Sequence, residues 1–341
     1  MYRMIPFIFI VICMPSMVFG GIIHVPAGQP SIQAGISAAT GGDTVLVAEG
    51  TYYENINFMG KAITVASRYY LDQKKEHIRN TIIDGSQPAN PDFGSVVSFV
   101  SGEDTKSVLC GFTITGGTGM KFIPPGFPEI RQGGGIVCLA SAAKICHNII
   151  KENSVQGSPL CFGAGIATGP PGFPVPIIIE KNTFTRNDVY GVLNGDGGGI
   201  SNRLPGRIVN NGFFKNSVFC ELGIASGGGL SSYTARDASA GHVLISRNTV
   251  TRNRVVSTTA DTIGAIAGGM EIWGFNMTVS NNVISHNTVS SAVDHSYGAG
   301  VVLDFPDNSV VFQNNVVSHN TFEGSGGCKG GAIAIWDGHA T

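Results

Sequence analysis

Two short motifs alternate along most of this chain, and their spacing constrains the fold more than any other feature. The first motif is a run of glycine and alanine that enters an apolar stretch, at 133–135, 163–165, 197–199, 227–229, 268–269, 298–300 and 330–331. The second is Asn-x-apolar-x-x-Asn, which pairs Asn148/Asn153, Asn182/Asn187, Asn211/Asn216, Asn248/Asn253, Asn282/Asn287 and Asn315/Asn320. The first Asn of each pair recurs every 29 to 37 residues.

A period of this length, filled with short β-prone stretches and turns, predicts the coils of a β-solenoid. Each coil buries its apolar side chains only by stacking on neighbours about 4.8 Å away. Asn at the same corner of every coil can bond to the Asn above, so we interpret the repeated Asn as structural ladders. Glycine, 48 of 341 residues, supplies the corners, and its clustering excludes collagen. A net charge of −2 without a basic run gives no indication of nucleic-acid binding.

The chain before the repeats predicts a leader and a cap. Residues 1–20 combine Arg3 with an apolar run and fit a signal peptide; a membrane anchor is the alternative, but the run is short and Pro15 interrupts it. Residues 31–39 predict a helix that caps the solenoid domain of residues 21–341. The last glycine motif lacks its Asn partner, so we expect a truncated C-terminal end and a longer parent protein.

Six cysteines follow the leader, and their spacing predicts no zinc site. Cys110 and Cys146 occupy equivalent positions of adjacent coils, where either a disulfide or two stacked thiols would fit. Small buried hydrophobic side chains are the interpretation that we favour for most of the six.

The segments 30–36 and 42–52 resemble the N-terminal cap and first coil of the pectin/pectate lyase-like superfamily, and the later repeats are similar to those of chlamydial polymorphic outer-membrane proteins. The resemblance implies an all-β, right-handed, single-stranded parallel β-helix with an N-terminal capping helix. For function it is weak, because the superfamily holds lyases, hydrolases, epimerases, adhesins and inert surface proteins. The paired aspartates and the Gly-His-Gly and Arg-Ile-Lys segments of polygalacturonases have no intact counterpart here, so no catalytic residue is assigned.

One column of outward-facing residues is the candidate binding site. By strand alternation, the second and fourth residues after each glycine motif point away from the core. The fourth position places Arg203, Tyr233, Trp273 and Asp304 on four successive coils, followed by Ile335, and the second position adds Glu271 beside Trp273. Aromatic faces beside charged groups suit an extended sugar chain, over roughly 14 Å of the solenoid. The alternative is an ordinary β face with scattered polar residues.

The sequence therefore predicts an exported, secreted or cell-surface β-helix protein that binds polysaccharide or a cell-surface glycan, or acts as an adhesin-like scaffold. We expect a monomer with no membrane span in the mature chain and no cofactor or metal. The alternative is a pectate lyase-like polysaccharide lyase acting on acidic glycans, with Glu271 and Asp304 as Ca²⁺ ligands and Arg203 as the base. Two carboxylates are a thin shell for an ion that takes 6–8 oxygen ligands.

Overall fold

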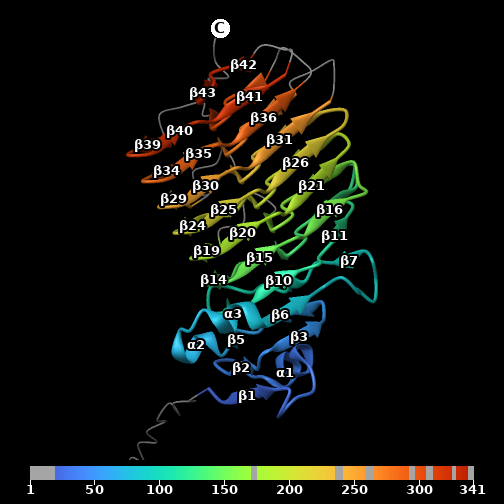
Figure 1. Cartoon of the computed structure of the whole chain (residues 1–341). Coiled ribbons are helices and arrows are strands. Elements are labelled where there is room, and N and C mark those ends of the chain that lie inside the picture. The colour runs from blue at the N-terminus through green and yellow to red at the C-terminus, as the bar shows by residue number, and fades with distance from the viewer. Residues whose placement is uncertain are drawn as a thin grey trace, which may run out of the picture.

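The protein is a parallel β-solenoid in which each turn of the chain adds one strand to each of several sheets (Figure 1). The computed structural model describes residues 20–169, 175–234, 241–258, 264–291, 296–304, 310–324 and 328–336. The signal peptide expected over 1–20 falls outside this range except for Gly20, so it stays a prediction. The all-β class and the stacked parallel coils predicted from the two motifs are confirmed.

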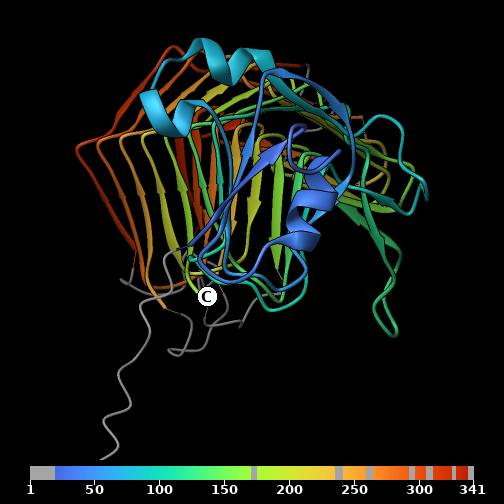
Figure 2. The same ribbon diagram turned by 90° about the horizontal axis from the view of Figure 1, so that it is seen from below.

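One coil from the middle of the solenoid shows the path that the others repeat. It runs through β24 (Gly206–Val209), β25 (Gly212–Phe214), β26 (Ser217–Cys220), β27 (Ile224–Ser226) and β28 (Leu230–Tyr233). These five strands belong in turn to five sheets, which we name A, B, E, D and C. Figure 2 looks along the stack, so that equivalent strands of successive coils overlie one another.

The strands of each sheet pair in parallel, apart from a hairpin in sheet D where β11 pairs antiparallel with β12 and β7. Besides β24, sheet A contains β1 (Ile22–Val25), β2 (Thr44–Val47), β5 (Thr64–Ser67), β9 (Val108–Cys110), β14 (Lys144–Cys146), β19 (Ile177–Glu180), β29 (Val243–Ser246), β34 (Met277–Ser280) and β39 (Val310–Gln313). Besides β25, sheet B contains β3 (Gly50–Tyr53), β6 (Thr81–Asp84), β10 (Thr113–Thr115), β15 (Ile149–Lys151), β20 (Thr183–Thr185), β30 (Thr249–Thr251), β35 (Val283–Ser285) and β40 (Val316–Ser318).

The other three sheets complete the coil. Besides β26, sheet E contains β16 (Ser154–Gln156), β21 (Asp188–Gly191), β31 (Arg254–Ser257), β36 (Thr288–Ser291) and β41 (Thr321–Glu323). Besides β27, sheet D contains β7 (Phe93–Gly94), β11 (Gly119–Phe122), β12 (Ile130–Gln132), β17 (Leu160–Phe162), β22 (Asn194–Asp196), β32 (Ala265–Ile266), β37 (Ser296–Tyr297) and β42 (Cys328–Lys329). Besides β28, sheet C contains β4 (Ile56–Asn57), β8 (Val97–Phe99), β13 (Ile136–Leu139), β18 (Ile166–Gly169), β23 (Ile200–Asn202), β33 (Met270–Trp273), β38 (Val301–Asp304) and β43 (Ile333–Trp336).

Three short helices lie in the first coils. The predicted cap is α1 (Ile32–Ala38), and the Ser31 hydroxyl accepts a hydrogen bond from the Ala34 amide at 3.1 Å, which stabilises its N-terminus. Its Ile32 and Ile36 are fully buried in the core, so the helix covers apolar surface that the first coil would otherwise expose (Figure 2). The sequence did not predict α2 (Tyr69–Asp72) and α3 (Glu76–Asn80), which lie on the outside of the solenoid (Figure 1).

The interior holds two hydrophobic cores. The larger one lies among sheets A, B and C and includes Ile179, Phe184 and Ile200, whereas the smaller one lies between sheets E and D and includes Val189 and Val218. The cross-section of the coil narrows between the two cores, where two corners face each other. One is formed by the glycine motif and joins sheet D to sheet C; we call it the glycine corner. The other joins sheet B to sheet E. A Cβ on Gly198 would lie only 2.8 Å from the backbone oxygen of Ser217, which explains the need for glycine there.

The two Asn ladders are confirmed. In every pair from Asn148/Asn153 to Asn282/Asn287, the side-chain amide donates to the Oδ1 of the Asn on the next coil, as from Asn182 to Asn211 at 3.2 Å and from Asn187 to Asn216 at 2.9 Å. The same amides also donate to buried backbone carbonyls. The ladders flank sheet B, and they satisfy polar groups that stacking takes out of water.

The question that the sequence left open for Cys110 and Cys146 has a geometric answer. The two residues are direct neighbours across β9 and β14, and both side chains are free thiols. Cys138, Cys161 and Cys220 are also free and buried, in agreement with their interpretation as small hydrophobic side chains.

Candidate functional site

A pocket of about 380 Å³ lies in the angle between sheets D and C, where the glycine corner turns the chain back on itself. One wall consists of strands β22, β27 and β32 of sheet D, and the other consists of strands β28, β33 and β38 of sheet C. All five residues predicted for the site line this pocket, namely Arg203, Tyr233, Glu271, Trp273 and Asp304. The register confirms that Tyr233, Trp273 and Asp304 occupy one column.

The aromatic part of the site is a pair of touching rings. The ring centroids of Tyr233 and Trp273 lie 4.2 Å apart with the planes tilted by 37°, and Trp273 keeps 43% of its surface exposed. The Arg203 guanidinium lies over the Tyr233 ring at 5.7 Å and over the Phe162 ring at 4.9 Å. The cation and the three rings therefore form one continuous stack, and Trp273 is its exposed end.

The acidic part of the site lies deeper. Glu271 Oε2 accepts hydrogen bonds from the hydroxyls of Ser226 at 2.7 Å and Ser231 at 2.8 Å, one from each wall. Burial raises the pKa of Glu271, and the nearby Asp196 carboxylate raises this pKa further. The two serine hydroxyls favour the ionised form and oppose the rise.

Asp196 is the charged residue of this pocket that the sequence analysis did not select. Its Oδ2 accepts a hydrogen bond from Arg203 at 2.9 Å, and the residue is only 8% exposed. Burial raises the pKa of Asp196, while the Arg203 guanidinium and the nearby Ser201 hydroxyl oppose that rise. Its Oδ1 and the Oδ1 of Asn194 are buried without a hydrogen-bond partner among the described residues. These two oxygens are enclosed in the pocket wall, and no described group satisfies them.

The sequence argument missed one whole wall because it followed only the strand after each glycine motif. The residue directly before the motif faces the same angle from sheet D, and this position contributes Phe162, Asp196 and Ser226. Ile266 pairs with Ser226 and continues this row, one residue further back because Ala267 takes the place of the first glycine. The expectation that the column is exposed was also too simple. Trp273 is exposed, whereas Arg203, Tyr233, Glu271 and Asp304 are half-buried because the corner is concave.

No family model, curated protein or solved structure matches this chain. Fold and site thus define a class, a parallel β-solenoid with an aromatic and acidic pocket in its glycine corner. In the part of the chain that the structure describes, no helix is long and apolar enough to cross a membrane. Within that same part, His, Cys, Asp and Glu side chains form no group of three or more able to hold a metal ion.

Proposed function

We propose that this protein binds polysaccharide through the glycine-corner pocket. The observation that carries the proposal is the combination of the Tyr233–Trp273 ring pair with the carboxyl and hydroxyl groups that line the same pocket. A sugar ring presents an apolar face that can stack on an aromatic ring, and hydroxyls that can donate to the carboxyl groups lining the pocket.

The charge of the pocket favours neutral sugars. Asp196, Glu271 and Asp304 contribute three carboxyl groups, and Arg203 is the one cation that lines the described pocket. An acidic sugar would meet repulsion there, because carboxylates that are close together disfavour further negative charge. We therefore expect neutral, hydroxyl-rich saccharides as ligands.

The lyase alternative receives no specific support. Its base, Arg203, donates to Asp196 and lies over two rings, and an arginine held in this way keeps its proton. Its acidic substrates would enter a pocket lined by three carboxyl groups. Binding without catalysis, in an exported, cell-surface or adhesin-like scaffold related to the pectin/pectate lyase-like superfamily, is therefore our proposal. The N-terminal apolar run supports export.

Replacing Trp273 with Ala tests the proposal. The purified protein is screened on a glycan array, and the affinity for the strongest neutral ligand is measured by calorimetry. Loss of one aromatic platform removes about 1.5 kcal/mol, which is about tenfold in affinity. Tyr233→Ala should have a similar effect because it removes the other ring of the pair.

Tyr190→Ala is the matched control. Tyr190 is 45% exposed and its ring lies 6.2 Å from that of Phe219, but it is on β21 in sheet E, away from the pocket. This variant should bind as the wild type does, and circular dichroism should show that all three variants are folded. Binding that survives both Trp273→Ala and Tyr233→Ala, or no binding to any glycan, would refute the proposal.

A further inference from the structure

The corners on both sides of sheet B place one residue per coil in the left-handed backbone region, directly before each ladder Asn. Their φ angles lie between 54° and 58°. Glycine and asparagine are the residues that adopt this conformation most readily. The first corner, which joins sheet A to sheet B, uses Asn at 210, 281 and 314, as this preference predicts.

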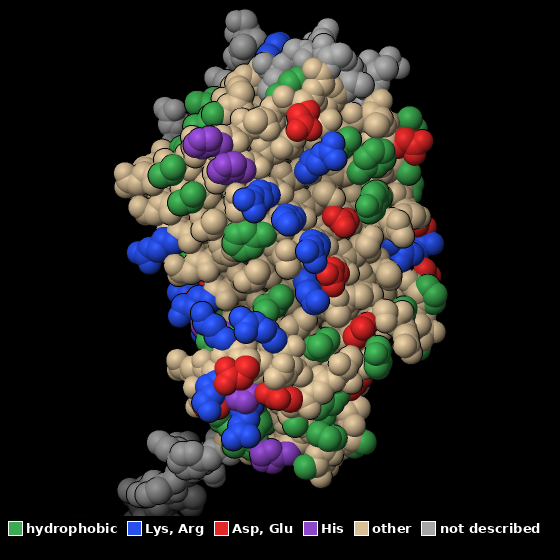
Figure 3. Space-filling model, in the orientation of Figure 1, with side chains coloured by type: hydrophobic (Ala, Val, Ile, Leu, Met, Phe, Trp, Pro, Cys, Tyr) green, Lys and Arg blue, Asp and Glu red, His purple; other side chains and the backbone are tan. Residues whose placement is uncertain are grey.

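Basic side chains occupy most of the other left-handed positions. The first corner carries His147, Lys181 and Arg247. The second corner, which joins sheet B to sheet E, carries Arg186, Lys215, Arg252, His286 and His319 on five successive coils. Backbone preference does not account for long basic residues here, since Asn would fit with less strain. All of them except His147 are exposed, and Figure 3 shows a band of blue and purple side chains along this face. The band points to a role at the surface.

We call this surface the basic face, and define it by those two corners together with Lys151, Lys75 and Arg79. It holds eight of the 21 Lys and Arg residues of a chain whose net charge is −2. Glu152 is the acid on it and pairs with Lys151 and Arg186, each at 3.2 Å. The adjacent Glu180 is paired with Lys144 at 3.2 Å and Arg207 at 3.0 Å. Most of the positive charge on the face is therefore uncompensated by the neighbouring acids.

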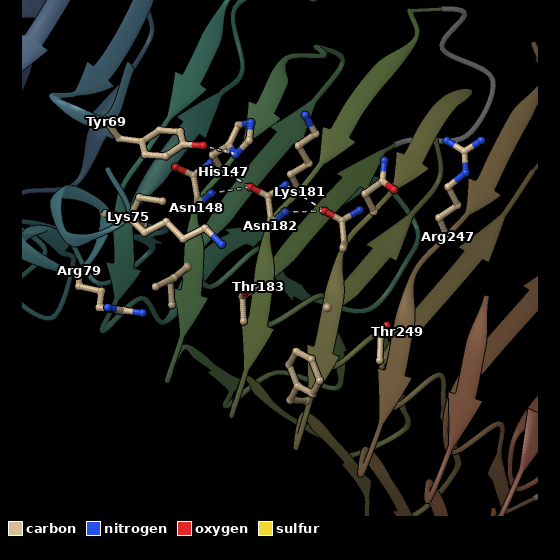
Figure 4. Close-up of a pocket in the computed structure, with 16 residues that line it drawn as sticks. Tyr69, Lys75, Arg79, His147, Asn148, Lys181, Asn182, Thr183, Arg247 and Thr249 are labelled. Carbon is tan, nitrogen blue, oxygen red and sulfur yellow. Dashed lines mark hydrogen bonds between the residues drawn. The ribbon is translucent and has the colours of Figure 1, made fainter. Parts of the chain in front are cut away.

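The basic face contains a groove of about 660 Å³ between α3 and the first corner. Lys75 and Arg79 extend over it from the helical side, and Lys181 and Arg247 border it along the coils (Figure 4). No Asp or Glu is among the described residues that line it. Gly212 has no side chain where the neighbouring strands carry Thr183 and Thr249, and the ring of Phe214 occupies that space.

The groove is lined mainly by polar side chains, together with the Tyr69 and Phe214 rings and two isoleucines. Phe214 lies over Gly212, where a Cβ would come within 2.4 Å of the ring. The Tyr69 hydroxyl and His147 Nδ1 are hydrogen-bonded at 2.8 Å. Burial, followed by the Lys181 charge, lowers the pKa of His147, so His147 is neutral near pH 7. The fixed cations thus provide the positive charge of the groove.

We propose that the basic face binds an anionic glycan chain that lies along the solenoid axis. On the second corner, Arg186, Lys215 and Arg252 lie on three successive coils at the inter-coil spacing of about 4.8 Å, so a linear polyanion along the axis can contact all three. The threonines and Phe214 between them offer hydroxyl bonding and a stacking surface to sugar rings. Sulfate and carboxylate groups both satisfy this chemistry. This site is on a different face from the glycine-corner pocket and does not depend on its function.

The test replaces three basic residues with asparagine, which adopts the left-handed backbone conformation more readily. The triple variant Lys181→Asn, Lys215→Asn and Arg252→Asn removes three charges from left-handed positions and should fold at least as stably as the wild type. Binding of dextran sulfate, hyaluronan and neutral dextran is measured at low salt. We expect one or both charged polymers to bind, and the triple variant to bind roughly tenfold more weakly, as three exposed ion pairs would give.

Three controls make the result specific. Met59→Asn makes the same kind of backbone replacement at φ 58° elsewhere, and Lys106→Asn removes an exposed charge outside the basic face, so neither should change binding. Trp273→Ala should leave it unchanged as well. Preference for dextran sulfate or for hyaluronan identifies sulfate or carboxylate as the recognised group. The proposal is overturned if the triple variant binds the charged polymers normally, if it loses dextran binding to the same extent, or if duplex DNA binds as tightly as the charged glycans.

Discussion

At the scale of single residues, the glycine-corner pocket concentrates chemistry that is otherwise rare in this chain. Only 13% of the residues are charged, yet Asp196, Arg203, Glu271 and Asp304 line one pocket. Burying an acid without full compensation costs free energy, and the raised pKa values of Asp196 and Glu271 express that cost. Such a cost is easier to understand in a binding site than in a purely structural corner.

Glu271→Gln should therefore stabilise the protein at neutral pH. The pKa of Glu271 is raised on folding, so the folded state holds its proton more tightly, and stability falls as pH rises from the ordinary value of 4.5 through the folded value. Gln removes this loss, while its amide oxygen can still accept from Ser226 and Ser231. The melting temperature of the variant should exceed that of the wild type at pH 7, and the difference should shrink toward pH 4.

Glu323→Gln provides the comparison, because Glu323 is exposed and lies 4.0 Å from Arg254. It should show little pH-dependent difference from the wild type. If Glu271→Gln instead melts below the wild type, with a deficit that grows with pH, then ionised Glu271 stabilises the fold and the role of burial assigned here is wrong.

At the scale of the element, the Asn ladder is the device that holds adjacent coils in register. Asn216 is fully buried, donates to the Phe184 carbonyl at 3.1 Å and to Asn253 at 2.9 Å, and accepts from Asn187. Asn216→Ala should cost about 2–4 kcal/mol of unfolding free energy, because it leaves buried polar groups without partners. Denaturant unfolding measures this loss.

Asn320→Ala tests the same ladder at a half-buried position. Asn320 accepts from Asn287 at 2.9 Å and donates to the Ile284 carbonyl at 3.0 Å, but water can replace these bonds. The cost should be less than half that of Asn216→Ala. Equal costs would mean that the ladder is stabilised by something other than the satisfaction of buried groups.

The elements also show why the sequence predicted the fold better than the site. Glycine and Asn recur because the backbone demands them, so their spacing alone reveals the coil. The pocket depends on which two strands face each other across the corner, and period alone does not reveal that pairing. Even the register failed once, because Ile335 was expected to extend the column, whereas the structure pairs Ile335 with Leu303 and Trp336 with Asp304. Ala332 takes the place of the last glycine there, so counting from glycine shifted the alignment by one residue.

The basic face escaped the sequence analysis for a related physical reason. Its members are spread over coils 29 to 37 residues apart, so no run of basic residues appears along the chain. They become neighbours only when stacking places equivalent corners side by side. The position directly before each ladder Asn carried the signal, and its left-handed backbone was not evident from the motif.

At the scale of the whole molecule, stability should vary along the solenoid, because each coil packs mainly on its two neighbours. Strands β39, β40 and β41 are the last described strands of sheets A, B and E. Their inward side chains Phe312, Val317 and Phe322 are only partly buried, whereas the equivalent Val279, Ile284 and Val289 of the preceding coil are fully buried. Backbone amides of residues 310–324 should therefore exchange with deuterium faster than those of residues 277–291, and both faster than those of the central coil that contains β25. Uniform protection along the stack would show instead that the solenoid unfolds as one cooperative unit, in which the burial of an individual coil does not set its local stability.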